Sequence, residues 1–145
     1  MFKNLVVISF FLVFVSCNKT TVNQIKVTSN NELKEAISEA KPGDEIILAN
    51  GVWKDIQIEF TGEGTEDAPI TLKAETEGEV FIEGISNLTF GGEYLVVSGL
   101  HFRNGYSPTK NVISFRVDAD NIANNCRVTN CVIIDFNKLQ RDNDD

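Results

Sequence analysis

Two cysteines are the side chains with the most obvious potential for chemistry. Cys126 and Cys131 lie five positions apart in the stretch NCRVTNCVIIDFN. Two thiols supply at most half of a zinc site, and neither a second cysteine pair nor a histidine pair accompanies them. A disulfide is chemically permitted in an exported protein, but residues on different strands around a corner are poorly placed to form one. The favoured prediction is therefore a pair of buried free thiols, because cysteine behaves as a small hydrophobic residue in a core.

The other side chains that could do chemistry are isolated in the sequence. His101 is the only histidine, and no carboxylate or nucleophile is obviously paired with it, so a surface or structural role is favoured over a catalytic base. Trp53 and Tyr106 could stack on sugar rings, but packing against the protein is favoured. A solvated face or loop, rather than calcium ligation, is predicted for the aspartates near the C-terminus, which are Asp118, Asp120, Asp135, Asp142, Asp144 and Asp145.

The N-terminal residues have the features of an export signal. Lys3 precedes the apolar run Leu5 to Val15, which is too short to span a membrane but fits the hydrophobic region of a signal peptide. The run ends in FVSC, which resembles the lipobox of a bacterial lipoprotein signal. We therefore expect a signal peptide over residues 1–17 with a lipidated Cys17, a tether over 18–24 and the folded domain over 25–145. The alternative is an ordinary signal with an incidental cysteine. The expected location is the periplasm or the outer-membrane surface, with membrane contact only through the lipid.

The charge balance argues against one class of partner. The chain has 13 basic and 21 acidic residues, a formal net charge of −8, and no run of basic residues. Such a chain has no electrostatic reason to bind nucleic acid. A polyanionic substrate would need a local basic or metal-bearing site that works against this overall field.

One helix and many strands must position these residues. Ser29 followed by Glu32 is a capping-box pattern, and the apolar spacing that follows predicts an amphipathic helix over residues 30–40. Pro42 and Gly43 end it. From Glu45 onward, short alternating segments rich in β-branched and aromatic residues predict an all-β domain.

Internal repetition favours one all-β architecture. YLVVSGLHF, residues 94–102, aligns with NCRVTNCVI, residues 125–133, and both have two short strands around a Gly or Asn corner. NVISFRV between them offers a third strand, with Ile113, Phe115 and Val117 on one side. Three strands per turn describe a right-handed parallel β-helix. A sandwich is disfavoured because the Asn-Gly pairs do not have hairpin spacing.

Several stretches resemble the N-terminal part of polysaccharide lyase family six, the alginate lyase and chondroitinase B group. They are NNELKEAISEAKPGDEIILANGVWKD, GEGTEDAPITLKAETEGEVFIEG and YLVVSGLHFRNG. The resemblance implies a β-helix whose first coil is capped by the helix at residues 30–40. It also implies β-elimination on alginate or a related uronate polymer. In that chemistry calcium neutralises the uronate carboxylate, a lysine abstracts the C5 proton and an arginine assists.

The resemblance does not reach this catalytic machinery. No position from 1 to 145 matches its lysine, arginine or calcium ligands, so the sequence predicts no catalytic residue and no metal ligand within the chain, which is expected to be an N-terminal fragment. We expect an acidic polysaccharide as partner and a monomeric protein. The chain by itself is expected to lack lyase activity and to aggregate through an open coil end. The alternatives are a non-catalytic carbohydrate-binding or structural β-helical module, or another pectin-lyase-like enzyme.

Overall fold

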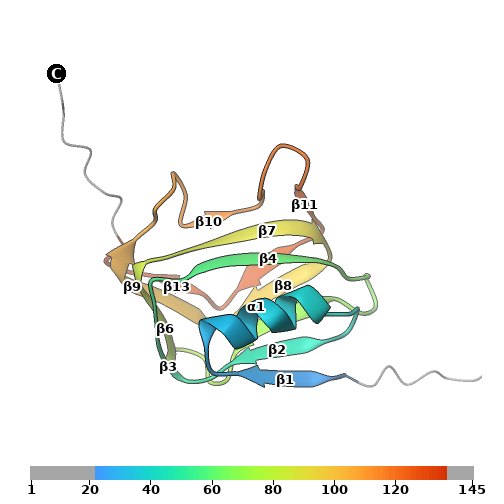
Figure 1. Ribbon diagram of the computed structural model, residues 1–145, viewed down its shortest axis with the longest axis horizontal. Helices are drawn as coiled ribbons and strands as arrows, with labels where there is room; N and C mark the ends of the chain where they lie inside the picture. The colour runs from blue at the N-terminus through green and yellow to red at the C-terminus, as the bar shows by residue number, and fades with distance from the viewer. Residues whose placement is uncertain (1–21, 137–145) are drawn as a thin grey trace, which may run out of the picture.

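The computed structural model describes residues 22–136. Cys17, the signal and tether up to residue 21, and the aspartates at 142, 144 and 145 lie outside the described residues. One helix and a series of short parallel strands make up the described part (Figure 1). The strands pair into three sheets in which every pairing is parallel. This confirms the predicted all-β parallel β-helix.

Successive turns of the β-helix contribute strands to three sheets. Sheet I contains β1 (Gln24–Val27), β2 (Glu45–Leu48), β5 (Ile70–Ala74), β8 (Leu95–Ser98) and β12 (Arg127–Thr129). Sheet II contains β3 (Gly51–Lys54), β6 (Val80–Ile85), β9 (Leu100–Tyr106) and β13 (Val132–Ile133). Sheet III contains β4 (Gln57–Glu63), β7 (Asn87–Glu93), β10 (Ile113–Ser114) and β11 (Ala123–Asn124).

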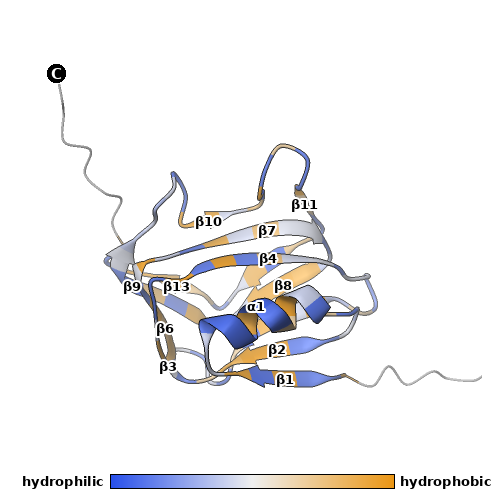
Figure 2. Ribbon diagram, in the orientation of Figure 1, coloured by the Kyte–Doolittle hydropathy of each residue, from blue (hydrophilic) through white to orange (hydrophobic). Residues whose placement is uncertain are grey.

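Apolar side chains stack in columns through the interior. In sheet I, Ile46 pairs with Leu72, Leu72 with Val97, and Val97 with Val128. Alternation along each strand sends every second residue inward, and the apolar segments alternate with hydrophilic ones along the ribbon (Figure 2). The first three members of this column are completely buried. Equivalent inward positions on successive coils thus form one continuous core.

The corners between the strands repeat in register because they share an unusual backbone conformation. Gly99 and Asn130 occupy equivalent corners between sheets I and II and both have positive φ, +80° and +50°. Asn104 in β9 and Asp135 after β13 are also in register, and both have a φ of +50°. Glycine, asparagine and aspartate tolerate this left-handed region best, which confirms the prediction of a Gly or Asn corner.

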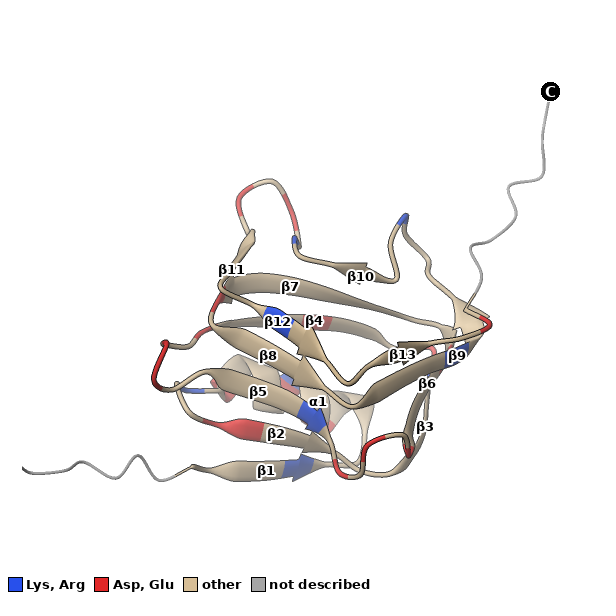
Figure 3. Ribbon diagram, turned by 180° about the vertical axis from the view of Figure 1, so that it is seen from behind, with Lys and Arg blue, Asp and Glu red and all other residues tan. Residues whose placement is uncertain are grey.

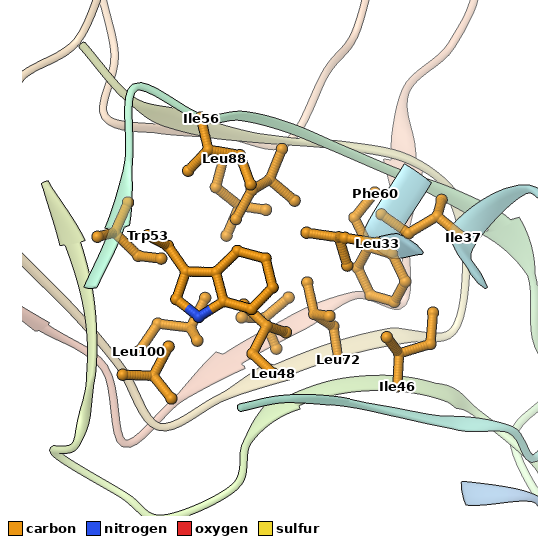
Figure 4. Packing of buried hydrophobic residues seen from close by; sticks show 14 of the residues in the cluster. Leu33, Ile37, Ile46, Leu48, Trp53, Ile56, Phe60, Leu72, Leu88 and Leu100 are labelled. Atoms are coloured by element: carbon orange, nitrogen blue, oxygen red, sulfur yellow. The ribbon is translucent and has the colours of Figure 1, made fainter. Parts of the chain in front are cut away.

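Helix α1 (Asn30–Glu39) covers one end of the β-helix, as predicted. Leu33 and Ile37 are buried, and Figure 4 shows Leu33 between Phe60 and Leu72 of the coils. The N-terminal cap also has the predicted residues, since the amide of Glu32 donates to Ser29 Oγ at 3.3 Å. The carboxylate of Glu32 accepts from the amide of Thr28 at 2.7 Å, and this bond lowers the pKa of Glu32.

The predicted third strand in NVISFRV is wrong in its length and exposure. Only Ile113–Ser114 forms a strand, and Phe115 is 45% exposed although its ring stacks on Phe90 at 4.9 Å between centroids. The chain then leaves sheet III in a tight excursion closed by a hydrogen bond from Val117 N to Asn121 O. It rejoins at β11, so the third coil is longer than its neighbours.

Candidate functional site

The two cysteines lie in the fourth coil at the predicted positions, stacked on the Leu95 and Leu100 positions of the coil before. Both are free thiols, which agrees with the prediction, but they are half-buried rather than buried. The reason is that no described coil lies on their other side. Burial raises the pKa of both Cys126 and Cys131, so at neutral pH they are protonated and poorly nucleophilic.

His101 lies on the outer surface of sheet II, in register with Val132 as predicted. Its ring packs against Phe81, with 5.6 Å between ring centroids, and its buried Nε2 has no hydrogen-bond partner in the described part of the chain. No carboxylate accepts from it there to orient the imidazole as a general base. The position therefore supports the structural role.

Arg103 and Glu83, which the sequence analysis did not single out, form an ion pair on the same surface. The guanidinium lies 3.4 Å from the centroid of the Phe81 ring, and its Nε donates to Glu83 Oε1 at 2.8 Å. This bond lowers the pKa of Glu83. Alternation in β6 and β9 could have indicated the contact, because it places Phe81 and Glu83 on the same face as His101 and Arg103. Both charges are already paired, so the group stabilises adjacent coils.

The aspartates and aromatic residues also have structural roles. Asp118 accepts from the amides of Asp120 and Asn121 and from the Asn121 side chain, which lowers the pKa of Asp118 and closes the excursion after β10. Trp53 is 6% exposed and donates from Nε1 to the carbonyl of Ala49 at 3.0 Å, so packing on the coil is confirmed. Tyr106 is half-buried in β9.

The described residues do not provide the ligands that a calcium site needs. Within residues 22–136, no three His, Cys, Asp or Glu side chains gather closely enough to hold a metal ion. Calcium prefers six to eight oxygen ligands, so we assign no calcium ligand and no calcium-dependent step to these coils. Among these same residues, no helix has the length and apolar character needed to cross a membrane.

One hollow on the outer surface is lined by an arginine together with aromatic, apolar and polar side chains. It has a volume of about 210 Å³ and lies at the corner between sheets III and I. In Figure 3 the ribbon of β12 carries a blue segment, which marks a basic residue in this strand. The hollow is lined by Glu66, Pro69, Tyr94, Val96, Asn125 and Arg127. No motif in the sequence singled these residues out, because they come from separate coils.

Comparisons with known proteins identify the family. The family model described as chondroitinase B matches residues 27–145. The solved structure of the alginate lyase AlyGC, of polysaccharide lyase family six (PL6), has 48% sequence identity and a TM-score of 0.75 over 76% of this chain, but this chain covers only 15% of that protein. A search of curated proteins finds no significant match.

Two further solved structures agree. The PL6 polysaccharide lyase Pedsa3628 from Pseudopedobacter saltans is 39% identical over 80% of this chain, with a TM-score of 0.70, and the match covers 26% of that protein. A mannuronic acid specific family-six lyase from human gut microbiota is 28% identical over 77% of this chain, with a TM-score of 0.69 and the same 26% share of that protein. The chain thus spans between 15% and 26% of these relatives, and it belongs to the chondroitinase B family of PL6 polysaccharide lyases.

Proposed function

We propose that this protein serves the depolymerisation of alginate, or a related uronate-containing polysaccharide, by β-elimination. The observation that carries the proposal is the family match over residues 27–145, together with 48% identity to an alginate lyase. The relative described as mannuronic acid specific supports the same substrate class. Fold alone would not support the proposal, because one fold carries many functions.

The described coils contribute the scaffold rather than the reacting groups. Their only histidine lacks an acid-base partner there, their cysteines are protonated thiols, and their ordered Arg103–Glu83 pair is internally neutralised. We therefore assign no catalytic residue to positions 22–136. The proposed contribution of this part is to start the β-helix from a closed end and to set the register of later coils.

A chimera tests the function. Residues 22–136 would replace the corresponding coils of AlyGC, and alginate cleavage would be followed by the ultraviolet absorbance of the unsaturated uronate product. We expect the chimera to retain activity, whereas the 145-residue chain alone should show none. A well-folded chimera without activity would count against the proposal, and product release by the 145-residue chain would contradict the assignment of the chemistry outside it.

A second candidate function is a non-catalytic carbohydrate-binding module. The absence of an acid-base constellation from residues 22–136 favours it. It predicts that the chain binds uronate oligosaccharides but that no chimera turns them over. Another pectin-lyase-like enzyme, such as a hydrolase, would instead release saturated sugars that lack the ultraviolet absorbance.

We also propose that the protein is an exported lipoprotein anchored through Cys17. The apolar run and the FVSC sequence support this. Labelling of the expressed protein with a radioactive fatty acid should be lost in Cys17→Ser.

We further propose that calcium does not bind residues 22–136, so that a chelator should leave the melting temperature of this part unchanged.

A further inference from the structure

We propose that the hollow formed by Tyr94, Asn125 and Arg127 is a binding subsite for one uronate unit of the polysaccharide. The inference rests on the proposed function for the substrate class, and it concerns residues to which no role in the reaction has been assigned. Three independent features carry it, which are the shape and lining of the hollow, an unpaired cation and a strained aromatic residue.

The hollow lies between two columns of side chains that run across the coils. The corner column contains Pro69, Tyr94 and Asn125, which lie in register with one another at the corner that precedes β5, β8 and β12. Val96 and Arg127 form the neighbouring outward column, because they are paired residues of adjacent strands. A volume of about 210 Å³ is large enough for one pyranose ring but not for a folded peptide. Its lining combines apolar and polar side chains, and a sugar ring with hydroxyl groups can contact both kinds.

Arg127 supplies a cation that has no ion pair among the described residues 22–136. The ion pairs of the described coils use Lys26, Lys73 and Arg103, whereas Arg127 has no ion pair or side-chain hydrogen bond among residues 22–136. An exposed guanidinium presents a planar fork that matches a carboxylate. The chain has a net charge of −8, so an arginine without an ion pair among the described residues is a local positive charge in a mainly negative protein.

Tyr94 is held in a conformation that its residue type disfavours. Its φ is +50°, and it is the only bulky residue among the positive-φ residues of the described chain, the others being Gly, Asn or Asp. The left-handed region is unfavourable for a residue with a Cβ, because the Cβ comes too close to the following carbonyl oxygen. Hydrogen bonds from Ile70 N to Tyr94 O and from Tyr94 N to Asn124 O, both 3.1 Å, hold the corner in place. Strain of this kind is often retained where the side chain is needed for binding.

Tyr94, Arg127 and Asn125 can each contact a different part of one uronate unit. The phenol ring offers a face or edge for the apolar side of the sugar, the guanidinium pairs with its carboxylate, and the Asn125 amide can bond a hydroxyl. Glu66 also lines the hollow, and its exposed carboxylate opposes an acidic ligand. The site should therefore be weak, and its affinity should respond in opposite directions to changes at Arg127 and Glu66.

The test is a titration of the 145-residue chain with an oligomer of mannuronate, followed by NMR of the arginine side-chain N–H groups, with a neutral gluco-oligosaccharide of equal length as comparison. Arg127→Ala should weaken binding about tenfold, and Glu66→Gln should strengthen it. Arg116→Ala is the matched control, since Arg116 is also an exposed arginine without an ion pair among the described residues, and it should have no effect. Equal binding of the neutral oligomer, or an equal loss in Arg116→Ala, would overturn the proposal.

Tyr94→Asn separates binding from folding. Asparagine tolerates positive φ, so this variant should be at least as resistant to urea as the parent while binding the acidic oligomer several-fold more weakly. Unchanged binding in this stable variant would remove Tyr94 from the site. The AlyGC chimera distinguishes the two proposals. Activity without oligomer binding at Arg127 refutes the subsite alone, and oligomer binding without activity refutes the proposed function alone.

Discussion

The first coil and the fourth coil have the same inward pattern but very different burial. Ile46 in the first coil is completely inaccessible, because β1 and α1 lie on one side of its coil and the second coil on the other. Ile133 in the fourth coil occupies the same kind of inward position, in register with the buried Phe102, yet it is 49% exposed. The alternation in the sequence thus determines whether a side chain points into the β-helix. Its burial depends in addition on a neighbouring element on each side of its coil.

The largest expected effect comes from breaking the closed end. In Leu33→Asp an unpaired carboxylate would replace a side chain that is 1% exposed, and the free energy of unfolding should fall by about 4 kcal/mol or more. Urea denaturation followed by circular dichroism measures this. Lys34→Asp, at the next and exposed position of the same helix, should change stability by less than about 1 kcal/mol. Similar losses in both variants would show that α1 does not seal the core.

A second prediction compares two stacked phenylalanines. Phe90 is fully buried and Phe115 is partly exposed in the next coil, with the rings stacked. Phe90→Ala should lower the free energy of unfolding by about 3–5 kcal/mol because it leaves a cavity. Phe115→Ala should lower it by about 1 kcal/mol, since much of that ring is already in water. Equal effects in the same urea assay would mean that Phe115 is covered in solution.

A third prediction tests the uncovered coil as a self-association surface. The 145-residue chain should associate through its exposed inward positions, and Ile133→Lys should shift it toward monomer in analytical ultracentrifugation. Val52→Lys is the control, because Val52 is 55% exposed but points outward from the first coil. Stability should change by less than about 1 kcal/mol in both. If Val52→Lys dissociates the protein equally well, the contact is not made by the fourth coil.

The smallest expected effect is a pH dependence from the Arg103–Glu83 pair. The pKa of Glu83 is lowered in the folded protein, so its contribution to stability is present above the unfolded pKa of about 4.3 and is lost as pH falls through the lower folded value. Glu83→Gln should therefore reduce the loss of stability on acidification from about pH 5 toward pH 3. Thermal melts across this range measure it. High salt should reduce the same slope in the parent, and a slope that Glu83→Gln leaves intact would contradict this account.

The sequence predicted those features that short-range chemistry determines. Ser29 and Glu32 indicated where α1 begins, and the Gly99 and Asn130 corners followed from backbone preference and repetition. These features depend on a few adjacent residues, so a single sequence was sufficient to find them.

Features that depend on contacts between coils were missed or wrong. Phe115 was expected to continue a strand, but the Asp118 turn diverts the chain shortly after it. Cys126 was expected to be buried, which its inward direction alone cannot ensure. The Arg103–Phe81 contact and the Tyr94–Arg127 hollow join residues from different turns of the β-helix. Their formation depends on register between coils, which residue types alone do not specify.

The excursion between β10 and β11 shows how this architecture can acquire new surface. The chain departs from sheet III after Ser114 and returns to pair with the same strand, β7, at Ala123, so the following corner at Asn125 still stacks on Tyr94. Lengthening this loop costs little entropy of loop closure, because each doubling of the loop length adds only about 0.6 kcal/mol to the free-energy cost. A peptide inserted after Ala119 should therefore be displayed on the outside of the β-helix while the coils beneath it stay in place, which makes this turn a natural attachment point for engineered recognition loops.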